Sequence, residues 1–177
     1  MCKLLVMLLV LAVPAFGQSQ VTDLTAAAGC GPSTMRFDVK VEKKQHSVTQ
    51  PGADKALVYV IQQGRPYNSD SAVTTRVGLD GVWVGANRGE SYMLFEANPG
   101  DHQVCVDWQS SLKARQRLSQ ATGVKMEAGK TYYFRTEVVT SQATEAHDEL
   151  LRLGTVDAAE GMLLVSKAGR STWTAKK

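Results

Sequence analysis

The sequence predicts a mainly β protein, a single antiparallel β-sandwich of about seven to eight strands with a short C-terminal α-helix. Two observations carry this prediction. Short apolar segments are separated by turn residues about every 8–12 positions, a spacing typical of antiparallel sandwiches and barrels. One segment near the C-terminus begins with a capping residue and ends before a glycine, as a short helix does.

The first two predicted strands differ in how much of each is buried. In residues 34–41 (TMRFDVKV), apolar and polar residues alternate, which indicates a strand with one buried face. A polar loop follows. Residues 56–63 (ALVYVIQQ) are apolar on both faces, so they are expected to form a central strand.

Turn residues place the next strands. Asp80–Gly81 stands between the apolar runs of residues 74–86 and predicts a tight hairpin. Residues 91–97 (SYMLFEA) form the following strand. Pro99–Gly100 then turns the chain into another strand over residues 101–109.

The C-terminal third changes from strands to a helix. A turn at Ala128–Lys130 divides residues 122–139 into two strands. Residues 141–153 fit either a helix or a loop that leads into an edge strand. The short helix is expected over residues 157–169, because Asp157 can cap it and a glutamate stands three positions later.

The N-terminus predicts export. Lys3 is followed by an apolar run over residues 4–13 and by small residues at Ala15 and Gly17, the pattern of a secretory signal peptide. The run is too short to span a bilayer, and we expect no transmembrane segment in the mature protein. The expected location is therefore periplasmic or extracellular. We divide the chain into a signal peptide (1–17), an irregular N-terminal segment (18–33), the sandwich domain (34–170) and a tail (171–177).

Charge does not indicate a nucleic-acid partner. The chain carries 20 basic and 17 acidic residues, a net charge of +3 at pH 7, and loss of Lys3 with the signal peptide lowers it by one. Basic residues gather within residues 40–44 and 113–117, without interleaved aromatics or a long helix. A protein that reads nucleic acid needs such a basic, aromatic-bearing surface. We therefore interpret both clusters as solvated loops.

Two cysteines remain once Cys2 leaves with the signal peptide. In an exported protein, the pair Cys30 and Cys105 predicts a disulfide. The sequence AAGC, residues 27–30, partly resembles a lipid-attachment motif. However, Ala27 replaces the usual large aliphatic residue, and a polar stretch separates the motif from the apolar run. Attachment of a lipid to Cys30 stays as an alternative.

His102 and Cys105 are three positions apart in one predicted strand. Because side chains alternate between the faces of a strand, these two point in opposite directions. They therefore cannot hold a metal together or form a nucleophile–base pair. Val104 and Val106 mark the core face, so Cys105 faces the other side, where the N-terminal segment can lie across the sheet. We predict that Cys105 is structural.

No motif for catalysis or metal binding stands out, and we predict no cofactor, no metal and no enzymatic activity. His46, His102 and His147 lack metal-ligand spacing, and EAHDE (145–149) is interpreted as a solvated polar segment. GVKMEAGKT (123–131) has five residues between its glycines where a phosphate-binding loop has four, and it leads into a strand. A pair of acids brought together by folding would instead make a small secreted hydrolase.

Aromatic side chains suggest where a ligand would bind. Trp83 is expected to face away from Val82 and Val84, where it can stack on a sugar or peptide, unless the C-terminal helix covers it. With Tyr92 and His102 it makes up the predicted ligand-contact surface. The expected partner is an envelope protein or a glycan.

Four stretches together carry a family resemblance: KALVYVIQ, GLDGVWVGANRGESYMLFEANPGDHQVCVDW, AGKTYYFRTEV and DAAEGMLLVSK. Over residues 52–167 the chain resembles an uncharacterised bacterial family, domain of unknown function 2846. The resemblance implies an exported or lipid-anchored envelope protein with a small β-sandwich similar to the PEGA type, and it implies no catalytic residues. We therefore expect a non-enzymatic binding or structural module of the cell envelope. The alternatives are the secreted hydrolase and a lipid-anchored component of an envelope complex.

Overall fold

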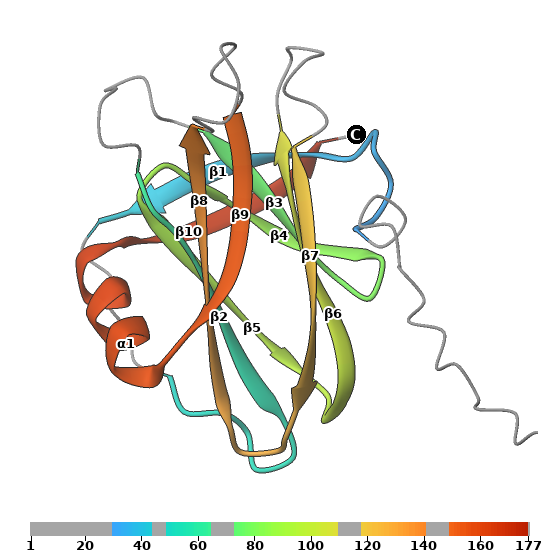
Figure 1. Ribbon diagram of the computed structural model, residues 1–177, viewed down its shortest axis with the longest axis vertical. Helices are drawn as coiled ribbons and strands as arrows, with labels where there is room; N and C mark the ends of the chain where they lie inside the picture. Colours follow the sequence, from blue (N-terminus) through green and yellow to red (C-terminus); the bar gives the residue numbers. More distant parts are fainter. Residues whose placement is uncertain (1–29, 44–48, 65–72, 110–117, 141–148, 177) are drawn as a thin grey trace, which may run out of the picture.

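The computed structural model describes residues 30–43, 49–64, 73–109, 118–140 and 149–176. In these residues, ten strands form two packed sheets and one helix lies against the larger sheet (Figure 1). The elements are β1 (Arg36–Glu42), β2 (Ala56–Gln62), β3 (Thr74–Leu79), β4 (Val82–Arg88), β5 (Ser91–Ala97), β6 (Gly100–Gln109), β7 (Ser119–Met126), β8 (Thr131–Thr140), β9 (Glu149–Val156), α1 (Ala158–Lys167) and β10 (Gly169–Lys176).

The mainly β class and the C-terminal helix are confirmed, whereas the predicted number of seven to eight strands is wrong. The larger sheet has the order β1-β10-β5-β2-β8-β9, and the smaller has the order β4-β3-β6-β7. Two pairs in the larger sheet, β2 with β8 and β10 with β5, are parallel. Parallel neighbours cannot be joined by a tight hairpin, and several other elements separate the two strands of each pair along the chain.

The two C-terminal strands account for the undercount. β9 lies largely in the segment whose sequence fitted either a helix or a loop before an edge strand. β10 extends into the segment assigned to a tail, and pairs with β1 from Arg36↔Lys176 to Glu42↔Arg170. Its sequence, GRSTWTAK, shows no apolar alternation, because most residues in the C-terminal half of the strand are exposed to solvent. The sandwich therefore extends beyond residue 170.

The two best sequence signals for strands are confirmed. β2 is buried along its whole length and lies between β5 and β8, as its apolar sequence predicts. The β3–β4 hairpin turns at Asp80 (φ 50°) and Gly81 (φ 81°), the left-handed conformations that a tight hairpin needs. Val77 pairs with Gly85 but Gly78 pairs with Trp83, so Val84 forms a β-bulge.

The core between the sheets is mainly aliphatic. Val58, Val60 and Phe134 of the larger sheet are fully buried there, together with Val77, Val104 and Val106 of the smaller sheet. The two layers therefore hold one another in fixed positions, since a close-packed interior resists displacement.

Helix α1 covers part of the outer face of the larger sheet (Figure 1). Its N-cap is Asp157, whose carboxylate accepts a hydrogen bond of 2.8 Å from the Glu160 N–H, as the sequence predicts. Gly161 rests on the ring of Tyr133 and leaves no room for a Cβ atom. Tyr59 and Tyr92 are buried in the same helix-covered layer.

Within the described part of the chain, no helix is long and apolar enough to cross a membrane.

Candidate functional site

Cys30 and Cys105 form a disulfide, as predicted, with their Cα atoms 5.3 Å apart. Both residues are buried. The β6 register places Cys105 opposite Gly78 on the outer face of the smaller sheet, whereas Val104 and Val106 face the core. β6 is unbroken from Gly100 to Gln109, so side-chain alternation turns His102 and Cys105 to opposite faces, which is consistent with the prediction.

Residues 30–37, which we call the N-terminal strap, lie across this outer face. The Trp83 indole N–H donates a 2.8 Å hydrogen bond to the Pro32 carbonyl. Gly31 contacts the same indole so closely that a Cβ would lie 2.8 Å from the ring, and its φ is +134°. Gln109 accepts from the Phe37 N–H at 2.7 Å and donates to the Phe37 carbonyl at 2.9 Å.

A buried arginine fastens the strap from beneath. Arg76 donates to the carbonyls of Ser33 (3.0 Å) and Met35 (2.6 Å) and to the carboxylate of Asp107 (3.0 Å). Its guanidinium lies 4.5 Å from the centre of the Trp83 ring. Burial raises the pKa of Asp107, and Arg76 opposes that rise. The disulfide and Arg76 thus hold the strap at two separate points.

The predicted ligand-contact surface is wrong in two of its three residues. Trp83 is only 8% exposed and Tyr92 is fully buried. Trp83 does lie on the outer face of its sheet, but the N-terminal strap covers it, not the C-terminal helix. Tyr92 lies under α1. Neither residue can stack on a sugar or a peptide.

The third residue, His102, joins two turns. Its Nδ1 lies 2.6 Å from Asp80 Oδ2 in the β3–β4 turn, and its Nε2 lies 2.8 Å from the Asn98 carbonyl before β6. Both partners are acceptors, so the protonated ring, which donates from both nitrogens, satisfies both contacts. The Asp80 hydrogen bond accordingly raises the pKa of His102. Burial acts to raise the pKa of Asp80, but hydrogen bonds from Gln103 and His102 outweigh it and lower that pKa.

Several other predicted positions lie outside the described residues: the signal peptide, Ala27, His46, His147 and the acidic residues 145–148. Among the residues that are described, no group of three or more His, Cys, Asp or Glu could hold a metal ion. The glycine-containing segment 123–131 runs from β7 through a turn into β8.

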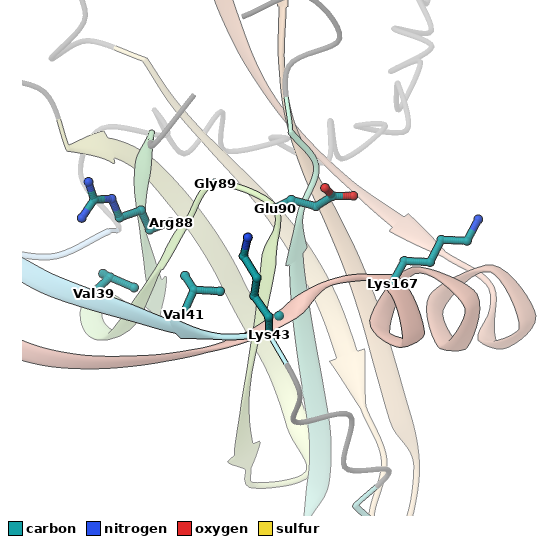
Figure 2. Close-up of a pocket in the computed structure, with 8 residues that line it drawn as sticks. Val39, Val41, Lys43, Arg88, Gly89, Glu90 and Lys167 are labelled. Carbon is teal, nitrogen blue, oxygen red and sulfur yellow. The ribbon is translucent and has the colours of Figure 1, made fainter. Parts of the chain in front are cut away.

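An open groove at one end of the sandwich brings together residues that the sequence did not single out as a site. We call it the basic groove. It has a volume of about 650 Å³, and Figure 2 draws the residues that line it. Its lining comes from β1 and the residue after it, from the β4–β5 turn, and from the junction of α1 and β10: Val39, Val41, Lys43, Arg88, Gly89, Glu90, Lys167 and Gly169.

Local geometry explains how these segments meet. Val39, Val41 and Lys43 are two residues apart, so strand alternation places them on one side. Gly169 lies against this side, where a Cβ would come within 2.5 Å of Val41 Cγ1. Only glycine permits this approach, and the same residue pairs with Ser91 of β5. Gly169 therefore joins the two walls of the groove.

Buried hydroxyl groups fix the β4–β5 turn that forms the second wall. Ser91 accepts a 3.1 Å hydrogen bond from the Arg88 N–H, and Ser171 lies 2.7 Å from the same hydroxyl. Both serines are buried. The Gly169 N–H donates to the Glu90 carbonyl at 3.3 Å. Because this backbone is held from within, the groove is formed before any ligand arrives.

The charge of the groove is positive. Lys43, Arg88 and Lys167 line it together with one carboxylate, that of Glu90, and all four residues are exposed. Figure 2 shows Lys43 reaching toward the β4–β5 turn, with Arg88 and Lys167 extending outward on either side of it. This excess of positive charge attracts an anion to the groove. Lys43 belongs to the basic cluster that we interpreted as a solvated loop, which was the one available sequence signal.

The comparisons with known proteins give a family without an assigned activity. A family described as "Protein of unknown function (DUF2846)" matches residues 52–149, more than half of the 177-residue chain. No curated protein and no solved structure gives a significant match. The matched residues include the β4–β5 turn, whereas β1, α1 and β10, which supply the rest of the basic groove, lie outside them.

Proposed function

We propose that this chain, which belongs to the DUF2846 family, is an exported, non-enzymatic binding module of the cell envelope that holds an anionic ligand in the basic groove. The observation that carries this proposal is the groove itself. Three cationic side chains and one carboxylate line a recess whose walls are fixed by buried hydrogen bonds. A preformed site loses less free energy on binding than one that must first become ordered.

Export is supported by the N-terminal sequence and by the disulfide. Residues 3–17 have the pattern of a signal peptide, and disulfides form in oxidising compartments such as the periplasm and the cell exterior. The sulfur of Cys30 is bonded to that of Cys105. A sulfur in a disulfide cannot also carry the thioether of a lipid anchor, which favours a protein that is exported without a lipid.

The three cations do not support the proposal equally. Lys167 stands in the last turn of α1, where a positive charge is favourable because of the helix dipole alone. Lys43 and Arg88 follow or end β-strands and have no such local reason. The charges of Lys43 and Arg88 are therefore better evidence for a binding groove than the charge of Lys167.

His102 does not supply a general base for the hydrolase alternative. His102 is the one histidine within the described residues, and its two ring nitrogens already contact Asp80 and Asn98. A general base needs a free nitrogen within reach of the proton that it removes. This ring instead holds two turns together.

The proposal is tested by isothermal titration calorimetry of the oxidised mature protein with inorganic phosphate. Exposed charge pairs contribute about 0.2–1 kcal/mol each, so three of them supply at most about 3 kcal/mol and we expect a dissociation constant of about 10 mM or weaker. Replacing two cations, Lys43→Gln with Arg88→Gln, should weaken binding about fivefold. The matched control is Lys125→Gln with Lys130→Gln, which removes the same charge from β7 and the turn after it.

Loss of affinity in the groove variant alone would support the proposal. Equal affinities in the two double variants would contradict it, because net charge and not the groove would then attract the phosphate. A wild-type protein that binds no phosphate would contradict it as well.

A further inference from the structure

We infer that the ligand of the basic groove is an amphiphilic anion, with a phosphate or carboxylate headgroup joined to an apolar chain. This inference rests on the proposed anion binding and adds what lies beside the charge. The groove is not cationic throughout, since the half-buried Val41 and the mostly buried Val39 of β1 also line it.

The order of residues along β1 places charge and apolar surface in line. Val39, Val41 and Lys43 share one side of the chain at intervals of two residues (Figure 2). At about 3.3 Å per residue, Lys43 lies roughly 13 Å from Val39 along the strand. With its headgroup at Lys43, a ligand would therefore extend its alkyl chain along β1 over Val41 and toward Val39.

The size of the groove also exceeds what a simple anion needs. A water molecule in the liquid occupies about 30 Å³, and a phosphate ion is only a few times larger. The groove has a volume of about 650 Å³, within the range of sites that hold small organic molecules. Most of this space would stay filled with water beside a free phosphate.

Apolar surface at the rim adds to that of the two valines. The side chains of Lys43 and Lys167 carry four methylene groups each, and such stems lie along apolar ligands while the ammonium group stays in water. Each ligand methylene removed from water improves affinity about fourfold. The headgroup would thus fix the orientation, and the chain would supply most of the affinity.

The test compares four probes on the oxidised mature protein by calorimetry, below the concentrations at which micelles form. They are inorganic phosphate, decyl phosphate, decanoate and decyltrimethylammonium. We expect both long-chain anions to bind at least tenfold more tightly than inorganic phosphate, which corresponds to two buried methylenes. Decyltrimethylammonium, with the same chain and a positive headgroup, should not bind. A difference between decyl phosphate and decanoate would identify the preferred headgroup.

A matched pair of variants tests where the alkyl chain of the ligand binds. Val41→Thr keeps the side-chain shape but replaces a methyl group by a hydroxyl, so it should weaken the binding of decyl phosphate severalfold more than the binding of inorganic phosphate. Val82→Thr makes the same change at a valine that is 64% exposed in the β3–β4 hairpin, and should change neither.

The results separate the inference from the proposed function. If decyl phosphate and inorganic phosphate bind equally well, the inference is wrong and anion binding stands. If no anion binds, both are wrong. An equal loss of affinity for both probes in Val41→Thr would show that Val41 only supports the groove. The ratio of the two affinities in the wild-type protein decides the question even where a variant does not fold.

Discussion

Removing the disulfide tests how the N-terminal strap is held. The change is Cys30→Ala with Cys105→Ala, and alanine is chosen because a serine hydroxyl at the fully buried position 105 would have to find a new partner. The two cysteines are 75 residues apart, so their bond restricts a long loop in the unfolded chain. In the chain-entropy account, a loop of that length is worth about 4 kcal/mol of unfolding free energy.

The expected fall in melting temperature follows from the size of the domain. For a chain of this length, each kcal/mol corresponds to about 2–4 °C, so the double variant should melt about 8–16 °C below the oxidised wild type. Wild-type protein treated with a reducing agent should melt at nearly the same temperature as the variant. Differential scanning calorimetry of the three samples gives the comparison.

Arg76 provides an internal check, because it contacts the same strap. Arg76→Met removes the partner of the half-buried Asp107 and three contacts of a buried guanidinium, and should destabilise the bridged protein by about 2–4 kcal/mol. In the protein without the disulfide it should cost less, since a strap that is partly released has already lost contacts with Arg76. Melting temperatures within about 2 °C for bridged and unbridged proteins, or strictly additive effects of the two changes, would refute this account of the strap.

Three further predictions concern other parts of the molecule. The contact with Asp80 raises the pKa of His102 in the folded protein, so protonation of His102 stabilises the fold below about pH 6.5, and this stabilisation is lost as pH rises through the folded pKa. Urea unfolding between about pH 6 and pH 8 should show the loss, and in His102→Gln this pH dependence should be absent. Gly161→Ala, which stabilises an ordinary helix, should here destabilise the protein by about 1–3 kcal/mol in urea unfolding because its methyl group meets the ring beneath α1, and a gain in stability would contradict that packing. N-terminal sequencing of protein from its native host should find a start near Gln18, and a start at a lipid-modified Cys30 would overturn the proposed export without an anchor.

The sequence predicted well where one local pattern decides the structure. The period of two in β1, the continuous apolar run of β2, the Asp80–Gly81 turn and the cap of α1 each depend on neighbouring residues. The disulfide followed from counting cysteines in a chain expected to be exported. Cys105 was placed correctly because alternation within one strand fixes its face.

Features that depend on distant segments were missed. Trp83 faces outward from its sheet as expected, but nothing in the sequence near it shows that the strap, some fifty residues earlier in the chain, covers it. β10 lacks an apolar pattern and exists because β1 supplies the backbone partners. The basic groove likewise needs three segments that meet only in the folded chain, and the lone signal, Lys43 within a basic cluster, fitted a solvated loop equally well.

The most direct test of the binding groove is an amide chemical-shift titration of the oxidised protein with decyl phosphate. The account predicts that the largest shifts come from Gly89, Glu90 and Gly169, with smaller ones along β1, and that Lys43→Gln reduces them at a given concentration. Amides beside His102, in the turns that its ring joins, should not move. Shifts spread over the surface, or gathered away from these three amides, would contradict the assignment of the groove as the ligand site.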